Sequence, residues 1–239
     1  MLDHELHNRA QQDYYAGDLK TRMRPVSTPY VLRHVEEVIR FGGLRPGQRV
    51  LEGGCGAGRY SFLLAGRGLE VEGLELSPVL ADRLREFDAG QHRIPVHCGD
   101  VANPPAALEG RFDAVTGFFM LHHLDDLTAA FRGFSRCLRP GGRAVFVEPN
   151  AWNPLYYLQV ALTKDMRWAA ERGIKNMRPG VLAPTMREAG LEDPEFRTFG
   201  FFPPFLRNTS WGGGVESLLE CAPGLGPVLP FRLIRARKP

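Results

Sequence analysis

Cysteine is scarce in this 239-residue sequence, and no two cysteines form a Cys-x-x-Cys pair. The four thiols are spread along the whole chain, at Cys55, Cys98, Cys137 and Cys221. This spacing excludes the usual cysteine-rich zinc sites and dithiol redox pairs. Widely separated thiols are typical of a reducing compartment, where disulfides are rare.

Long apolar runs and a strong excess of one charge are also missing. No uninterrupted apolar run approaches the length of a membrane-spanning helix, and the polar start from Met1 to His7 lacks the apolar core of a signal peptide. The net charge of +3 is small for this length and gives no electrostatic argument for nucleic acid. We therefore expect a cytoplasmic protein with no membrane or nucleic-acid partner.

Strand and helix patterns alternate five times through the first 150 residues. Such alternation predicts an α/β fold, a doubly wound and mostly parallel sheet with helices on both faces. Thr28-Pro29 and Ser77-Pro78 are typical helix starts, and Pro140-Gly141-Gly142 and the glycines after Trp211 indicate turns. The predicted strands cover residues 49–51, 69–75, 94–98, 112–119, 143–148, 195–199 and 231–237.

A glycine-rich turn joins the first predicted strand to the next helix. Its pattern is Glu52-x-Gly54-x-Gly56-x-Gly58. Closely spaced glycines let the backbone bend sharply and let a ligand approach the N–H groups at the helix start. The dinucleotide pattern Gly-x-Gly-x-x-Gly fails, because Arg59 or Ser61 stands where its last glycine belongs. The Gly-Lys-Ser/Thr of a phosphate-binding loop is absent as well.

The glycine pattern resembles the first motif of class I S-adenosylmethionine-dependent methyltransferases, and the resemblance continues in chain order over residues 28–150. It includes an acidic residue closing the second strand, an Asp after the third, a Phe-Asp-x-Val strand followed by His-His-Leu, and a closing Leu-x-Pro-Gly-Gly. These motifs are Glu75, Gly99-Asp100-Val101, Phe112-Asp113-Ala114-Val115, Leu121-His122-His123-Leu124 and Leu138-Arg139-Pro140-Gly141-Gly142.

The resemblance implies S-adenosylmethionine as cofactor and S-adenosylhomocysteine as product. Glu75 would accept hydrogen bonds from the ribose hydroxyls, Asp100 would bind the adenine amino group, and an aromatic ring would face the sulfonium. The implied cofactor-binding residues are Glu52, Gly54, Cys55, Gly56, Gly58, Glu75, Leu76, Asp100, Val101, Phe118, Phe119 and Tyr15.

The resemblance also implies a Rossmann-like sheet of seven strands in a single domain spanning residues 1–239. Within it we expect an N-terminal arm or helical cap (1–27), a cofactor-binding core (28–150), a helical insertion facing the substrate (151–190) and C-terminal strands (191–239). The insertion follows the fifth strand.

His122 and His123 are the candidate acid/base residues, because a histidine titrates near neutral pH and could take the proton released on methylation. The alternative is that the pair only caps or packs against the following helix. Candidate substrate residues lie at the fifth strand's end and in the insertion: Glu148, Asn150, Tyr156 and Tyr157.

Several motifs are absent from the sequence, and their absence limits the kinds of acceptor molecule that we expect. No Asn/Asp-Pro-Pro-aromatic motif follows the fourth strand, which disfavours N-methylation of bases or side-chain amides. The strand ends in Gly117-Phe118-Phe119, without an acidic ligand, so no metal is expected. Residues 149–190 and 200–214 are rich in aromatic and aliphatic side chains, which suits a small apolar or aromatic molecule.

We therefore predict transfer of a methyl group to an oxygen, nitrogen or carbon of a small metabolite. Two alternatives remain open. One is a cofactor-binding fold without methyl transfer, such as a partner subunit or a cyclisation scaffold. The other is a methyltransferase acting on RNA or protein. The acceptor atom and the oligomeric state are not encoded in any of these motifs.

Overall fold

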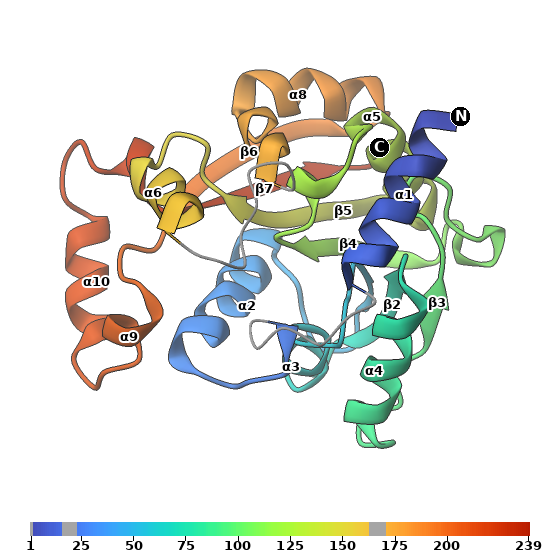
Figure 1. Ribbon diagram of the computed structural model, residues 1–239, viewed down its shortest axis with the longest axis horizontal. Helices are drawn as coiled ribbons and strands as arrows, with labels where there is room; N and C mark the ends of the chain where they lie inside the picture. Colours follow the sequence, from blue (N-terminus) through green and yellow to red (C-terminus); the bar gives the residue numbers. More distant parts are fainter. Residues whose placement is uncertain (1, 16–22, 163–170) are drawn as a thin grey trace.

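The computed structural model describes residues 2–15, 23–162 and 171–239. A seven-stranded sheet runs through it in the order β3-β2-β1-β4-β5-β7-β6, and β7 alone is antiparallel to its neighbours (Figure 1). The predicted doubly wound, mostly parallel sheet is therefore confirmed. The strands are β1 (Arg49–Gly53), β2 (Glu70–Glu75), β3 (Val96–Cys98), β4 (Phe112–Phe118), β5 (Leu138–Pro149), β6 (Glu192–Phe199) and β7 (Phe231–Arg237).

Helices cover both faces of the sheet, and each face has its own apolar core (Figure 1). Neighbouring residues of a strand point to opposite faces, so Val50 packs in one core and Leu51 in the other. One face carries α2 (Pro29–Gly42), α3 (Ser61–Ala65) and α4 (Pro78–Asp88), and the other carries α5 (Leu127–Cys137) and α8 (Pro179–Glu188).

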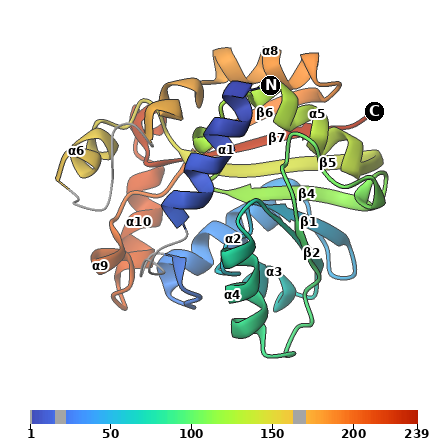
Figure 2. The same cartoon turned by 45° about the vertical axis from the view of Figure 1, so that its right-hand side comes forward.

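Most of the remaining elements lie around the strands' carboxyl ends or at one end of the molecule, where α6, α9 and α10 gather (Figures 1 and 2). They are α1 (Leu2–Tyr15), η2 (Ala106–Leu108), η3 (Leu121–His123), α6 (Pro154–Leu162), η4 (Arg172–Asn176), α9 (Pro204–Arg207), α10 (Gly212–Glu220) and η5 (Gly226–Val228). In the described part of the chain, no helix is both long and apolar enough to cross a membrane.

Both predicted helix starts are confirmed. The Thr28 hydroxyl accepts a hydrogen bond from the Val31 N–H at 3.5 Å, and the Ser77 hydroxyl accepts one from the Leu80 N–H at 3.4 Å. A proline follows each cap, where its fixed φ suits the first helical turn and its missing N–H costs nothing.

The turn predicted at Pro140-Gly141-Gly142 is wrong, because these residues lie inside β5. Phe112 pairs with Leu138 and Ala114 with Arg143, so the residues between them form a bulge in the ladder. Gly141 has φ +76°, which a glycine adopts without strain. Backbone hydrogen bonds with Lys238 keep the bulge attached to the C-terminal strand.

The turn predicted over Trp211–Gly214 is also wrong, since α10 begins at Gly212. A Cβ on Gly212 would lie 2.2 Å from the Leu206 carbonyl oxygen, so the missing side chain permits α10 to pack closely on α9. The buried Glu216 carboxylate accepts the N–H groups of Phe201 and Phe202, each at 2.9 Å. Tertiary contacts thus outweigh the weak helix propensity of glycine.

Between β5 and β6 the chain forms α6, η4 and α8, as expected for a helical insertion after the fifth strand. The helix α8 packs against α5 on the face of the sheet, whereas α6 and η4 lie near the strand ends. The division of the chain at residues 27, 150 and 190 stays a prediction.

Candidate active site

The glycine turn after β1 uses the backbone freedom that its sequence predicts. Gly54, Gly56 and Gly58 have φ of +63°, +54° and +85°, a region that other residues seldom adopt. The Gly54 N–H donates to the Leu74 carbonyl oxygen at 2.8 Å, which fixes the turn to the end of β2. A Cβ on Gly58 would lie 2.7 Å from Phe62, so this position also needs glycine for packing.

Glu75 closes β2 and turns its carboxylate toward the glycine turn. One oxygen accepts the Gly56 N–H at 2.8 Å and the other accepts the Ser77 N–H at 2.9 Å. The side chain is buried, and burial raises the pKa of its carboxyl although both backbone hydrogen bonds oppose the rise. A carboxylate at this place can exchange such partners for the hydroxyl groups of a ligand.

Glu52, in β1, is buried and bonded within the protein. The Ser61 hydroxyl donates to its Oε2 at 2.5 Å, which links the strand to the start of α3. Burial raises the pKa of this carboxyl to about 8, against the effect of the Ser61 hydrogen bond and with a smaller rise from Glu75. The acid form of Glu52 is therefore favoured at neutral pH.

Asp100 follows β3 and meets the N-terminal helix. Its carboxylate accepts the Ala102 N–H at 2.8 Å and the Asn8 side-chain amide at 2.6 Å. Gln12, one turn further along α1, donates to the Leu76 carbonyl oxygen at 2.9 Å. The helix α1 thus lies beside the ends of β2 and β3 (Figure 1).

The residues predicted around the cofactor differ in accessibility. Cys55 and Val101 are buried, and the Cys55 sulfur packs so close to Gly73 that a Cβ there would lie 2.5 Å from it. Leu76 is partly exposed. Tyr15 ends α1, and its side chain lies outside the described part of the structure. Acidic acceptors on two neighbouring strands, with glycine N–H groups between them, fit the hydroxyl and amino groups of an adenosyl ligand.

An aromatic cluster occupies the end of β4. The buried Phe118 ring stacks on Tyr60, with centroids 4.1 Å apart and planes 8° apart. Phe119 has φ +55°, a costly conformation for a bulky residue that is found mostly at functional sites. Its ring meets His34 at 5.1 Å and Phe231 at 5.6 Å. Burial lowers the pKa of His34 to about 3, so this imidazole is neutral.

His122 lies in η3 between two carboxylates. Its Nδ1 is 2.5 Å from Glu148 Oε2, and its Nε2 is 3.2 Å from Glu171 Oε2. The other Glu148 oxygen accepts the N–H groups of Met120 and Leu121, at 2.8 and 2.7 Å. All three side chains are almost completely buried. The end of β5 therefore fixes both the backbone and the imidazole of η3.

The two carboxylates determine the charge of His122. Burial alone would lower the pKa of the imidazole, but the charges and hydrogen bonds of Glu148 and Glu171 raise it to about 9. Burial would raise the pKa of Glu171, yet its bonds to His122 and to the Tyr156 hydroxyl bring it to about 2. Without another cation, His122 is an imidazolium at neutral pH and cannot accept a proton.

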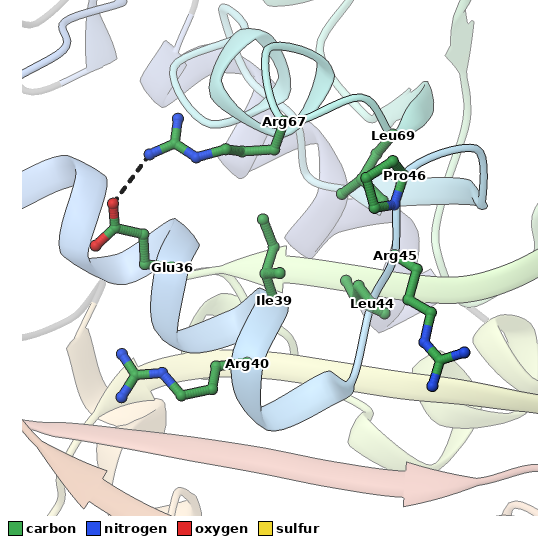
Figure 3. Close-up of a pocket in the computed structure, with 8 residues that line it drawn as sticks. All are labelled: Glu36, Ile39, Arg40, Leu44, Arg45, Pro46, Arg67 and Leu69. Carbon is green, nitrogen blue, oxygen red and sulfur yellow. Dashed lines mark hydrogen bonds and ion pairs between the residues drawn. The ribbon is translucent and has the colours of Figure 1, made fainter.

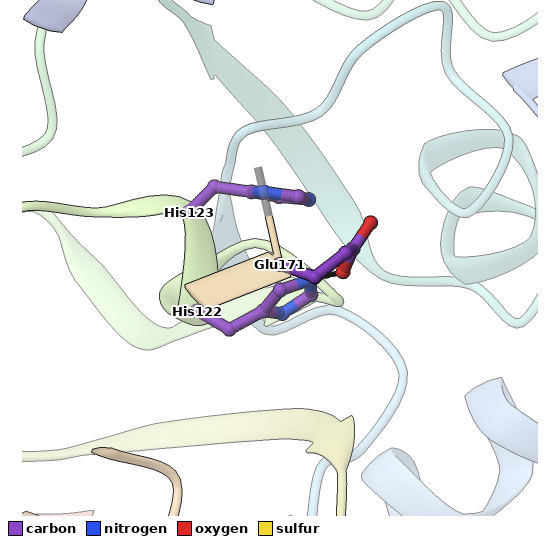
Figure 4. Close-up of side chains that lie close together, drawn as sticks. All are labelled: His122, His123 and Glu171. Carbon is purple, nitrogen blue, oxygen red and sulfur yellow. Dashed lines mark ion pairs between the residues drawn. The ribbon is translucent and has the colours of Figure 1, made fainter. Parts of the chain in front are cut away.

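His123 is the more accessible of the two histidines, and its ring centroid lies 4.0 Å from that of His122. Figure 4 shows His122, His123 and Glu171 reaching into one common space. Glu171 was missed by the sequence interpretation. A faint signal exists in Gly173, because a Cβ there would lie 2.0 Å from the His122 carbonyl oxygen. Glycine thus lets η4 approach η3 and bring Glu171 to the histidine.

The predicted substrate residues separate into two groups. Tyr156 is partly buried and donates its hydroxyl hydrogen to Glu171 at 2.5 Å, so it belongs to the cluster, and the Tyr157 hydroxyl donates to the Ala151 carbonyl oxygen. Asn150 and Glu148 are fully buried.

The amide of Asn150 donates to the Pro227 and Leu229 carbonyl oxygens, and its own oxygen accepts from Arg232 at 2.6 Å. The Glu148 carboxylate is used by η3 and His122. These contacts bind the polar atoms of both side chains within the protein, and a contact of either residue with substrate stays a prediction.

A hollow of about 270 Å³ lies at the opposite edge of the sheet, below the start of β1 (Figure 3). Apolar side chains such as Ile39 and Leu69 line it, and an ion pair between Arg67 and Glu36 at 2.9 Å crosses its rim. In open α/β sheets ligands bind at the carboxyl ends of the strands, so this hollow is not part of the candidate site.

Comparison with known proteins agrees with the geometry. A family model described as a methyltransferase domain matches residues 21–195. A ubiquinone biosynthesis O-methyltransferase of Aromatoleum aromaticum is 31% identical over 192 residues, which cover 78% of this chain and 81% of that protein.

Two solved structures share the fold over nearly the whole chain. A geranyl diphosphate C-methyltransferase from Streptomyces coelicolor A3(2) has a TM-score of 0.62 at 17% identity, covering 98% of both chains. A methyltransferase described as a possible histamine N-methyltransferase from Thermotoga maritima has a TM-score of 0.60 at 21% identity, covering 99% of both chains. With the glycine turn, the acidic strand ends and the family match together, the chain belongs to the class I S-adenosylmethionine-dependent methyltransferases.

Proposed function

We propose that the enzyme methylates a hydroxyl group on a small, apolar, planar aromatic acceptor. This acceptor would sit between the aromatic cluster at Phe118–Phe119 and the pair His122–His123. The observation that carries this proposal is the pair His122–His123 beyond β4, in which two carboxylates fix His122 and the His123 ring lies against it. The names of the related ubiquinone biosynthesis enzymes support oxygen as the acceptor atom.

The cofactor side of the site would hold S-adenosylmethionine, which supplies a methyl group on a sulfonium. Glu75 would accept the ribose hydroxyls, and Asp100 would accept the adenine amino group in place of Asn8. Gly54, Gly56 and Gly58 would let the methionine portion approach the backbone, with Glu52, Cys55, Leu76 and Val101 forming the walls. Phe118 and Phe119 would line the methyl path.

The protein's main contribution is alignment, because the sulfonium methyl is already activated. The aromatic cluster excludes water and orients a flat acceptor. Loss of the acceptor's proton still needs a polar group nearby. His122 is charged between Glu148 and Glu171, so His123 is the residue that would take the proton when no other cation is bound. The His122 ring lies against the ring of His123 and would keep His123 in position.

Transfer of the labelled methyl group from S-adenosylmethionine to a panel of small phenols, alcohols and amines tests the proposal. We expect the phenols to be methylated, and His123→Gln to lower kcat by about 100-fold with little change in cofactor affinity. Activity on amines alone would contradict the choice of oxygen. Binding of the cofactor without transfer to any acceptor class, or transfer only to RNA or protein, would favour the alternatives.

A further inference from the structure

The space between His122 and Glu171 is shaped for a cation. The Nδ1 of His122 is 2.5 Å from Glu148, but its Nε2 is 3.2 Å from Glu171, longer than a charge-assisted N–H···O bond of about 2.7–2.9 Å. When Glu148 accepts the Nδ1 hydrogen of the neutral ring, the Nε2 lone pair faces a carboxylate oxygen. Two facing acceptors need a proton or a metal ion between them.

The third donor comes from His123. One donor atom from each of His122, His123 and Glu171 can be chosen so that all lie within 4.8 Å of one another. Figure 4 shows the three side chains converging, two from η3 and one from the residue before η4. Ligands 2.0–2.2 Å from a zinc-like ion lie roughly 3–4 Å apart, so small side-chain movements suffice to coordinate one.

The surroundings of these donors resemble the support that metal ligands usually have. A ligating histidine commonly donates its other ring hydrogen to a carboxylate, as His122 does to Glu148. Backbone N–H groups of Met120 and Leu121 hold that carboxylate in turn. The Tyr156 hydroxyl orients Glu171 in the same way. Two of the three ligands, His122 and Glu171, would thus be held in place before an ion arrives.

The buried carboxylates also favour a dication. Glu148 and Glu171 are both buried, and each carboxylate lies against the His122 ring. A divalent ion beside Glu171 would place positive charge between these two carboxylates, which lowers the cost of burying them.

We propose that His122, His123 and Glu171 bind a divalent transition-metal ion of the zinc type, with one coordination position open toward the acceptor. Two imidazoles and one carboxylate suit such an ion, whereas Mg²⁺ prefers oxygen ligands. The inference departs from the sequence-based expectation of no metal, which considered only acidic residues at the strand ends.

The site also bears on the proposed function. In the loaded protein the His123 lone pair is used for the ion, so the ion and not His123 would promote loss of the proton from an acceptor hydroxyl at the open position. This consequence rests on the proposed function. Ion binding itself does not, and it can be measured without any acceptor.

Titration of the full-length, chelator-treated protein with Zn²⁺ by calorimetry tests the site. We expect one ion per chain, and at least about 100-fold weaker binding in His123→Gln and in Glu171→Gln. Co²⁺ substitution should give visible absorption bands that these variants lose. His97→Ala is the matched control, because His97 also contacts a carboxylate, that of Glu72, at 2.9 Å. This substitution should leave Zn²⁺ binding unchanged.

His123 is partly exposed, so its replacement tests the site without risk to the core. Absence of stoichiometric binding, or equal binding by wild type and His123→Gln, overturns the metal proposal. An equal loss of Zn²⁺ affinity in His97→Ala also overturns the metal proposal, since Zn²⁺ binding would then be unspecific. Methyl transfer to phenols that persists unchanged in the chelated enzyme contradicts the ion's catalytic role while leaving the proposed function intact.

Discussion

The two sides of the active site are built in different ways. On the cofactor side, the glycine turn, Glu75 and Asp100 each lie at the carboxyl end of a strand or within two residues of it. On the acceptor side, His122 depends on Glu148, 26 residues away, and on Glu171, which comes from the helical insertion. One side is an edge shared by neighbouring strands, and the other is a buried charge network joining distant segments. Substitutions should therefore separate cofactor binding from turnover.

The largest effect is expected on the cofactor side, from Glu75→Ala. It removes a carboxylate that would bind two ribose hydroxyls, so cofactor affinity should fall by about 100-fold, or about 3 kcal/mol. Titration calorimetry with S-adenosylmethionine measures it, and thermal unfolding checks that the variant folds. Glu70→Ala, at the exposed start of the same strand, is the control and should bind normally. Unchanged affinity in Glu75→Ala would remove this residue from the cofactor site.

Gly173→Ala tests the acceptor side. Its Cβ would lie 2.0 Å from the His122 carbonyl oxygen, so η4 has to move and carry Glu171 away from the cluster. We expect kcat to fall by more than about 10-fold while cofactor affinity stays within about 2-fold, since misplacement of about 1 Å can cost as much.

Gly180→Ala provides the matched comparison for this variant. Gly180 lies in α8, and a Cβ there would meet nothing within 4 Å. This substitution should leave kcat unchanged and stabilise the helix slightly. If Gly173→Ala weakened cofactor binding as much as turnover, the two sides would not be separable in the way proposed.

The pH dependence of stability provides a third test, on Glu52. Its pKa is about 8 in the folded protein and 4.5 in the unfolded chain. A folded pKa above the unfolded value means that the stability from this group is complete below pH 4.5 and is lost as the pH rises toward 8.

Relative to Glu52→Gln, wild type should therefore lose up to about 1.4 kcal/mol of unfolding free energy per pH unit within that window. Urea unfolding at pH 5, 6 and 7 without cofactor measures the difference. Parallel stability curves for the two proteins would show that Glu52 is ionised in the fold.

The smallest effect is expected from His97→Ala. The imidazole pairs with Glu72, but Arg49 and Arg111 also contact that carboxylate, at 3.0 and 2.8 Å. His97 lies near the surface, so we expect this pair to contribute about 0.2–1 kcal/mol, as surface ion pairs do. Stability should fall by that amount, with kcat and cofactor affinity unchanged. A large loss of activity would mean that this edge of the sheet communicates with the active site.

The same contrast explains how far the sequence could predict the site. Strand ends follow from apolar periodicity, so Glu75 and Asp100 could be placed from spacing alone. His122 and His123 could be identified, but the charge of His122 could not, because it depends on carboxylates that lie 26 and more residues away, at Glu148 and Glu171. Asn150 was expected to face substrate since it follows a strand. Its bonds to Arg232 and the residues before β7 depend on the antiparallel final strand, which spacing does not reveal.

The helices near α10 show a second limit. Three consecutive glycines indicate a turn by propensity, yet Gly212 begins a helix because α9 packs against it. The bulge at Gly141 is similar, since its shape is fixed by Lys238 at the far end of the chain. In both cases the deciding partner is distant in sequence.

The hydrogen bonds of Asn150 and Asn153 have a wider consequence for how this enzyme could change. Asn153 donates to the Val228 carbonyl oxygen at 2.5 Å, and Asn150 donates on either side of it, at Pro227 and Leu229. The root of the helical insertion is thus tied to the loop before β7, independently of the residues from α6 to η4. Exposed side chains of α6, such as Leu155, Leu158 and Leu162, can therefore vary without loosening the sheet, so new acceptor preferences could evolve on an unchanged cofactor-binding frame.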